Sequence, residues 1–202
     1  MFFNAAVFSG NPASVSYVDN SVAKLQLQLD QDPDVRVGKS YPGGGGKVFY
    51  IDNKLRRGLI AYSGSALSEQ WCETSVTNEH IETCSELFCG KQNTNNMLAN
   101  VACSSPLAIA VTSIAAPKCQ PPLKNCSGWY IPSTAEIFTL IATKDIINLN
   151  TEVLYWTSNE ATDFEDEFQN RAVLLLYMGS IVTATMDKYM SAAAQPIRSF
   201  AY

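Results

Sequence analysis

The chain has 202 residues, of which 47 % are hydrophobic and 16 % charged, and its net charge is −5. This length allows one ordinary domain, with or without a short appendage, and the hydrophobic fraction excludes a disordered chain. The densest basic cluster is only Lys54–Arg57, so nucleic acid is not expected as a partner. The longest apolar run, residues 107–116, is too short to cross a bilayer, so membrane insertion is not expected either.

The polarity of the chain comes largely from neutral side chains. Few residues are charged, and Ser, Thr, Asn and Gln supply most of the polar side chains. Neutral polar surfaces of this kind are common in proteins that bind sugars or pack into assemblies. The first residues, MFFNAAVFSG, have no basic region of the kind that begins a secretory signal. We therefore expect the chain to act in a virion, which needs no such signal, or at the outer surface of a cell.

Six cysteines lie close together in the chain: Cys72, Cys84, Cys89, Cys103, Cys119 and Cys126. No Cys-x-x-Cys pair occurs and His80 is the only histidine, so a zinc site is not expected. A local disulfide framework and six buried thiols are both compatible with the sequence. The loop-like surroundings of the cysteines favour disulfides, but the sequence does not say which cysteines pair.

Residues 14–29, SVSYVDNSVAKLQLQL, predict an amphipathic helix that Ser14 can cap. Its apolar residues alternate in spacings of three and four, as in a heptad seam: Val15, Val18, Val22, Leu25 and Leu29. A helix this short either packs on its own domain or joins two or three chains in a bundle. Its terminal position, which Pro33 separates from the rest of the chain, favours the bundle, and we expect a homotrimer.

Residues 43–62 predict a β-hairpin. The glycines of Gly43–Gly46 are not a phosphate-binding loop, because neither a helix start nor a Gly-Lys-Ser/Thr motif follows them. They are expected to let the backbone pass close to a neighbour. The strands read KVFYI and GLIAY, with a turn at Asp52–Asn53.

Two helices are predicted in the middle of the chain. Residues 97–115 are compatible with a helix that Pro106 starts, kinks or ends. A second helix is expected after a cap at Ser133 or Thr134, and Glu136 is placed for a capping box with Ser133.

The last part of the chain predicts strands at residues 153–158, 171–179, 180–186 and 196–202. Gly179–Ser180 is expected to form a tight turn between two of them. Trp129 and Trp156 are expected in the core, and Arg198 is expected to pair with Glu136 or with loop carbonyls. Helices and a hairpin followed by antiparallel strands predict an α+β fold.

Six segments, taken in chain order, form the most informative pattern: GGKVFYID, GLIAYS, GKQNTNNM, GWYIPSTAEI, YWTSNEA and PIRSFAY. Together they resemble DUF1566, the C-type-lectin-like module found in a collagen-like bacterial adhesin and in many phage fibre and bacterial surface proteins. The resemblance covers about residues 43–202. It implies a C-type-lectin-like fold of two helices and twisted antiparallel sheets, in which GKQNT leads into the first helix.

The chain departs from the family at two places. Ser127–Gly128 stands where the residue before the Trp is often acidic, and Arg198 stands alone where the last strand often has two basic residues. The resemblance therefore implies the fold but no particular ligand. The expected organisation is an N-terminal segment over residues 1–38, with a trimerising helix at about 14–30, and a lectin-like domain over residues 39–202.

No enzymatic chemistry is expected. His80 lies in a polar loop and gives little support to a Ser-His or Cys-His site, so no catalytic residue is predicted. The acidic run Asp163–Glu167 has oxygens that could bind Ca²⁺, but it lacks the alternating spacing of a calcium loop. No metal site and no cofactor are therefore predicted, and the run is expected to be a solvated loop of the kind that displays a binding surface.

These observations predict a receptor-binding module, most plainly a trimeric phage tail-fibre or tail-tip protein that binds a glycan or protein on the host surface next to other virion proteins. The expected ligand contacts are Trp71, Glu73, Asp163, Phe164, Glu165 and Asp166. The alternatives are a bacterial surface adhesin, a virion or cell-envelope assembly protein without a ligand, and an enzyme of the sulfatase-modifying type.

Overall fold

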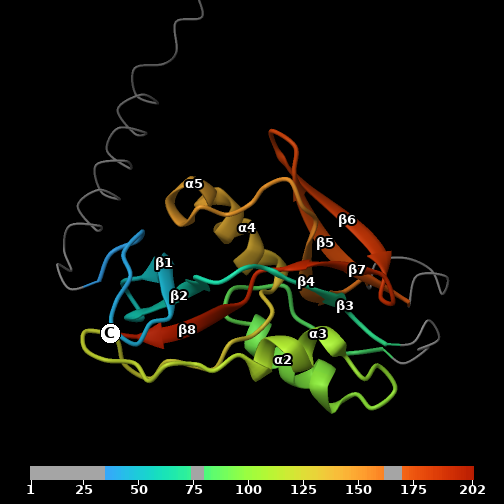
Figure 1. Cartoon of the computed structure of the whole chain (residues 1–202), viewed down its shortest axis with the longest axis horizontal. Helices are drawn as coiled ribbons and strands as arrows, with labels where there is room; N and C mark the ends of the chain where they lie inside the picture. The colour runs from blue at the N-terminus through green and yellow to red at the C-terminus, as the bar shows by residue number, and fades with distance from the viewer. Residues whose placement is uncertain (1–34, 74–79, 162–169) are drawn as a thin grey trace, which may run out of the picture. The chain divides into compact units, whose positions relative to one another are not determined.

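The computed structural model describes residues 35–73, 80–161 and 170–202, and every structural statement below concerns these residues. The chain divides into two units, Met1–Arg36 and Val37–Tyr202, and the fold is that of the second unit. Its elements in chain order are β1 (Gly46–Asp52), β2 (Arg57–Tyr62), β3 (Leu67–Gln70), α2 (Gly90–Ala99), α3 (Pro106–Ser113), α4 (Thr134–Ala142), α5 (Lys144–Ile147), β4 (Tyr155–Glu160), β5 (Arg171–Tyr177), β6 (Ile181–Asp187), β7 (Ser191–Ala194) and β8 (Ile197–Ala201) (Figure 1). This is the α+β fold that the sequence predicts.

Two groups of predicted functional residues lie outside the described residues. One is the seam of the N-terminal helix: Val15, Val18, Val22, Leu25 and Leu29. The other is the acidic run with its expected ligand contacts: Asp163, Phe164, Glu165 and Asp166. Both stay predictions.

A three-stranded antiparallel sheet with the order β1-β2-β8 contains the predicted hairpin. Its first pair is Gly46 with Tyr62, and a Cβ on Gly46 would overlap the carbonyl oxygen of Ala61. The expectation that a glycine here allows close backbone approach is therefore confirmed. On β8, the Nη1 of Arg198 donates to the carbonyl oxygen of Pro117 at 3.0 Å and, at longer range, to those of Gly43 and Gly44. Arg198 thus binds loop carbonyls, which was one of its two predicted roles.

A five-stranded sheet has the order β3-β7-β4-β5-β6. The contact between β4 and β7 is parallel and the other pairings are antiparallel. The β5–β6 hairpin closes at the predicted turn, where Gly179 has a φ of 75° and the N–H of Met178 donates to the carbonyl oxygen of Ser180. A φ in this range favours glycine. The hairpin prediction for residues 171–186 is confirmed.

The helices α3 and α4 begin at serine caps. Pro106 occupies the first turn of α3, and the hydroxyl of Ser105 accepts from the N–H of Ala108 at 3.1 Å. The capping box predicted for α4 is present between Ser133 and Glu136. The predicted helix over residues 97–115 is wrong in its bounds, because α2 ends at Ala99 and α3 starts anew at Pro106.

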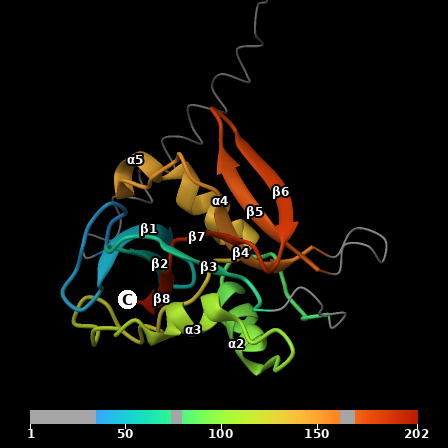
Figure 2. The same cartoon turned by 45° about the vertical axis from the view of Figure 1, so that its right-hand side comes forward.

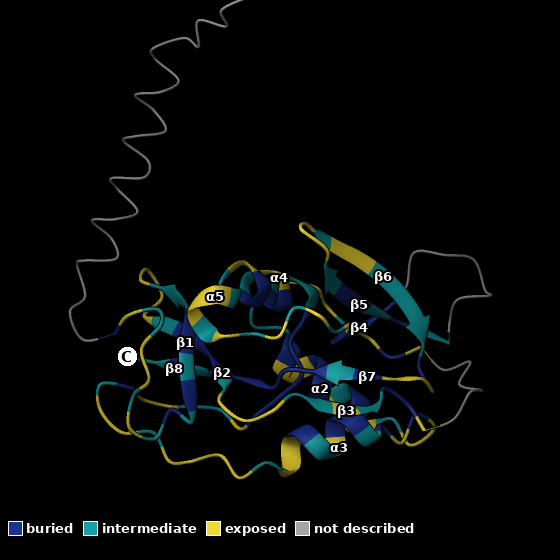
Figure 3. Ribbon diagram, turned by 45° about the horizontal axis from the view of Figure 1, so that its top comes forward, coloured by how far each residue is buried: buried dark blue, intermediate teal, exposed yellow. Residues whose placement is uncertain are grey.

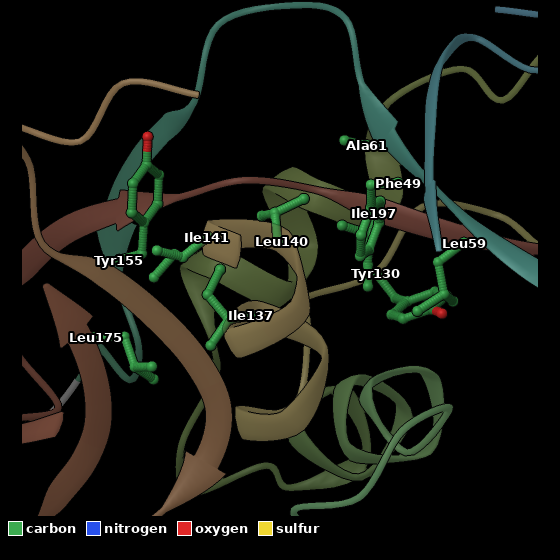
Figure 4. Packing of buried hydrophobic residues seen from close by; sticks show 10 residues of the cluster. All are labelled: Phe49, Leu59, Ala61, Tyr130, Ile137, Leu140, Ile141, Tyr155, Leu175 and Ile197. Atoms are coloured by element: carbon green, nitrogen blue, oxygen red, sulfur yellow. The ribbon is translucent and has the colours of Figure 1, made fainter. Parts of the chain in front are cut away.

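One buried cluster connects both sheets through α4 (Figure 4). In the close-up, Ile137, Leu140 and Ile141 of α4 lie between Tyr155 and Leu175 on one side and the residues of the small sheet on the other. The cluster consists of Phe49, Leu59, Ala61, Tyr130, Ile137, Leu140, Ile141, Tyr155, Leu175 and Ile197. The tryptophans Trp129 and Trp156 are buried as predicted. Burial of this apolar surface is the main favourable term in the stability of the fold.

All six cysteines form disulfides, which confirms the favoured of the two predictions. The bridges are Cys72–Cys103, Cys84–Cys89 and Cys119–Cys126. The first spans 31 residues and closes the longest loop, so it contributes most to stability in the loop-entropy account. It fastens the end of β3 to the start of α3.

Candidate functional site

A groove of about 690 Å³ lies along β3, β7 and the segment that leads from α5 into β4. Its polar lining residues carry neutral hydroxyl or amide groups: Ser65, Ser68, Asn148, Asn150, Tyr155, Ser191 and Gln195. The other lining residues are glycine or apolar: Gly64, Ala66, Leu67, Val153, Leu154, Met186, Ala192 and Ala193. None of these residues is charged. The groove is therefore suited to a ligand that offers hydroxyl groups and some apolar surface but no net charge.

The end of α5 places Asn148 in the groove. Asn148 is the C-cap residue, with a φ of 60° and ψ of 46°, and the N–H of Leu149 donates to the carbonyl oxygen of Lys144 at 2.9 Å. Asn tolerates this left-handed conformation better than most residues with a side chain. The Asn148 side chain is exposed, and no hydrogen bond joins its amide to another described residue. It is thus a donor and acceptor that a ligand can reach.

A buried tyrosine fixes the segment that leads from α5 into β4. The hydroxyl of Tyr155 donates to the carbonyl oxygen of Asn150 at 2.6 Å, and the side-chain oxygen of Asn150 accepts from the N–H of Glu152 at 2.9 Å. Burial raises the pKa of Tyr155 to about 12, so its phenol stays protonated and keeps donating throughout the physiological range. The segment from Asn150 to Tyr155 is therefore held in place before any ligand binds.

A second, smaller hollow of about 230 Å³ adjoins the groove and shares Gly64, Asn148 and Gln195 with it. The Nε2 of Gln195 donates to the carbonyl oxygen of Tyr62 at 2.9 Å, which fixes this side chain between the two hollows. Lys47 lines the smaller hollow, and its Nζ donates to the carbonyl oxygen of Ile146 at 3.1 Å. The two hollows share one border, and among the described residues Lys47 is the one charged residue that lines either of them.

A buried charge cluster lies at the far end of β4. One carboxylate oxygen of Glu160 contacts the Nζ of Lys188, and the other accepts from the N–H of Ile81 at 2.7 Å and lies 2.6 Å from the Nδ1 of His80. Glu160 and Lys188 are both buried. Burial lowers the pKa of Lys188, while the Glu160 carboxylate acts in the opposite direction. The cluster joins the segment at His80 to β4 and to the end of β6. Its charged groups already pair with one another.

The structure places the predicted contact Trp71 in the interior. Its side chain has no exposed area, its Nε1 donates to the carbonyl oxygen of Thr157 at 2.9 Å, and the Nζ of Lys188 lies 5.1 Å from the centre of its ring. A side chain this deeply packed does not reach a ligand, so the prediction for Trp71 is corrected to a core role. Glu73 is exposed next to it, and its N–H donates to the carbonyl oxygen of Cys103. Its role in binding stays a prediction.

Sequence reasoning missed the groove. Its residues come from four separate stretches, which meet only because β3 pairs with β7 and because β7 lies beside β4. The one signal in the sequence was the general abundance of neutral polar side chains, which gave no positions.

Among the described residues, no group of three or more His, Cys, Asp or Glu side chains is placed to hold a metal ion. In the same part of the chain, no helix is both long and apolar enough to cross a membrane. When the chain is compared with known proteins, neither a protein-family model nor a curated protein matches it.

Proposed function

We propose that this chain is a receptor-binding module that takes an uncharged glycan of a host surface into the groove between β3, β7 and residues 148–155. The observation that carries the proposal is the lining of the groove, which combines hydroxyl and amide groups with apolar surface and has no charged side chain. Sugars present the same combination of hydroxyl groups and apolar ring faces. The exposed amide of Asn148 and the fixed amide of Gln195 are the recognition groups.

The assembly in which the module works is part of the same proposal. The fold is C-type-lectin-like, which the six sequence segments and the combination of helices with antiparallel sheets support. Three copies associate through the helix that the sequence predicts at about residues 14–30, as a phage tail fibre or tail tip. Such a trimer multiplies a weak affinity at each site by avidity. A bacterial surface adhesin would use the groove in the same way.

A virion or cell-envelope assembly protein is the second candidate function. The observation that favours it is strand β6 at the border of the large sheet, whose outer edge no other described strand covers and whose one charged residue, Asp187, stands at its end. In this alternative the groove holds a segment of a neighbouring protein, and no free glycan binds.

Replacing Ser68 with arginine is expected to weaken glycan binding at least tenfold, or about 1.4 kcal/mol. Ser68 is an exposed groove residue on β3, and the larger charged side chain fills the groove while the strand pairing with Ala193 stays intact. The probe is an array of neutral oligosaccharides beside sialylated and uronic-acid-containing ones. Ser85→Arg, an exposed serine outside the groove, is the control and should bind as the wild type does. Equal binding by Ser68→Arg, or binding of acidic glycans alone, contradicts the groove as the site.

Chelation of calcium is expected to leave this binding unchanged. No residue that lines the groove carries a carboxylate, so the ligand is held by hydroxyl and amide groups and not through an ion. The measurement is the affinity for the bound oligosaccharide in the presence of EDTA and then with Ca²⁺ restored. A loss of affinity in EDTA that Ca²⁺ reverses would place recognition at carboxylates elsewhere in the chain.

A further inference from the structure

The edges of the two sheets differ in how they are covered. The edge of β1 is covered by the segment that precedes it. The N–H of Gly38 donates to the carbonyl oxygen of Val48, and the N–H of Val48 donates to the carbonyl oxygen of Lys39. The edge of β8 is bridged by the pairing of Tyr130 with Ile197. The edge strand β3 is protected differently, because it is only four residues long and packs against α3. An uncovered strand edge is a template for pairing with another chain, so covering it prevents association.

Among the described residues, the edge formed by β6 is open. Between described residues, no backbone hydrogen bond joins the outer side of this strand to another segment. The strand projects with β5 beyond the neighbouring elements, and both views show β6 at the outer border of the hairpin (Figures 1 and 2). Alternate residues of an antiparallel edge strand point their N–H and C=O groups outward, so β6 has a row of donors and acceptors that no other described residue pairs.

The sequence of β6 contains none of the usual protections against pairing. It reads IVTATMD, with no proline, no lysine and no charge before Asp187, and its register with β5 runs from Arg171 to Tyr177 without a bulge. Apolar side chains around it reach solvent: Met178 is 72 % exposed and Val182 is 41 % exposed. Figure 3 colours β6 as intermediate and exposed. β-branched residues of this kind favour an extended strand.

We propose that β6 pairs with β6 of a second copy of this chain, antiparallel about a two-fold axis at Ala184. This register places Thr183 opposite Thr185 and Val182 opposite Met186, and small alanines meet on the axis. Cross-strand pairs of threonine and of apolar residues stabilise a sheet. A two-fold contact uses the same surface on both copies, so one exposed strand suffices.

Charge favours this strand as the meeting point of two copies. The chain carries a net charge of −5, so most approaches of one copy to another are repulsive. On β6 the one charged residue, Asp187, lies at the end of the strand, where the Nε of Arg171 donates to it at 3.1 Å. In the proposed register each Asp187 faces Ile181 of the other copy, so the two carboxylates stay apart.

The mass of the full chain in solution tests the pairing. Ala184→Lys places two ammonium groups opposite each other on the axis, and like charges there oppose pairing. Light scattering is expected to give half the wild-type mass when the paired strands belong to different N-terminal bundles, and the thiol experiment below detects pairs within one bundle. Val101→Lys, a residue 90 % exposed after α2, is the matched control and should keep the wild-type mass. Circular dichroism checks that each variant is folded, and Val182→Lys provides a second disruption of β6.

Covalent trapping gives an independent result. All six native cysteines are in disulfides, so Ala184→Cys adds the only free thiol. Opposite residues of a non-hydrogen-bonded pair have Cα atoms about 4.5 Å apart, which suits a disulfide. Mild oxidation should convert Ala184→Cys into covalent dimers several-fold faster than Val101→Cys. Equal rates, together with an Ala184→Lys mass equal to that of the wild type, would overturn the pairing.

The pairing of β6 and the binding of a glycan in the groove can fail independently of each other. Ala184 is not among the residues that line the groove, so Ala184→Lys is expected to bind the same oligosaccharides at each site. Loss of pairing with retained binding supports both proposals, whereas unchanged mass with retained binding removes only the pairing.

Discussion

Replacing Lys188 with methionine is expected to lower the free energy of unfolding by about 3–5 kcal/mol, the range measured when one partner of a buried ion pair is removed. The Lys188 ammonium contacts Glu160, and only about 2 % and 1 % of the two side chains is exposed. Without the ammonium, the buried Glu160 side chain loses the counter-charge that balances its burial. Urea unfolding at neutral pH, followed by circular dichroism, gives the free energy.

The double variant Glu160→Gln/Lys188→Met separates the ion pair from the loss of packing. It removes both charges, so it should regain much of the stability that the single variant loses. Lys54→Met, at an exposed lysine in the β1–β2 turn, is the control and should unfold like the wild type. If Lys188→Met loses no more than Lys54→Met, the cluster does not hold β4 and β6 together as described.

Glu136→Gln is expected to lower the free energy of unfolding by about 2–4 kcal/mol, although it changes a single oxygen to nitrogen. Both carboxylate oxygens are occupied: Oε1 accepts from the N–H of Phe88 and the hydroxyl of Tyr130, and Oε2 accepts from the N–H groups of Gly90 and Ser133. An amide nitrogen at either position would face two donors. Burial raises the pKa of Glu136 while these hydrogen bonds act against the rise.

The effect should be seen in unfolding by urea, with Glu152→Gln as the matched control. Glu152 is exposed, and its replacement should change the free energy of unfolding by no more than about 0.5 kcal/mol. A loss for Glu136→Gln as small as that of the control would mean that the four donors find other partners. In that case Glu136 would not join α2 to α4.

The sequence predicts elements well where one residue type has a specific local role. Ser133 and Glu136 predict the start of α4, because a capping box needs only residues three apart. Gly179 predicts the β5–β6 turn, because its positive φ is unfavourable for other residues. The capping box did not reveal that Glu136 also accepts from Phe88 and Gly90, since those partners come from another part of the chain.

Elements that depend on their neighbours were missed. The strand β7 reads SAAA, which has little intrinsic preference for a strand, and its extended form comes from pairing with β3 and β4. The helix α2 already starts at Gly90, whereas GKQNT was expected to lead into a helix, and its Asn93 and Thr94 are buried and hydrogen-bonded in the interior. The groove was missed for the same reason, because Ser65, Asn148 and Ser191 are far apart in the sequence and come together only in the folded chain.

An NMR titration of the full chain with the neutral oligosaccharide that binds best on the array shows whether the groove is where the ligand binds. If the groove is the site, the side-chain amide signals of Asn148 and Gln195 shift in a saturable manner. The same shifts should be lost in Ser68→Arg and kept in Ser85→Arg. Saturable shifts confined to Glu73 and residues 162–169, with Asn148 and Gln195 unchanged, would contradict the groove and return recognition to the acidic segment.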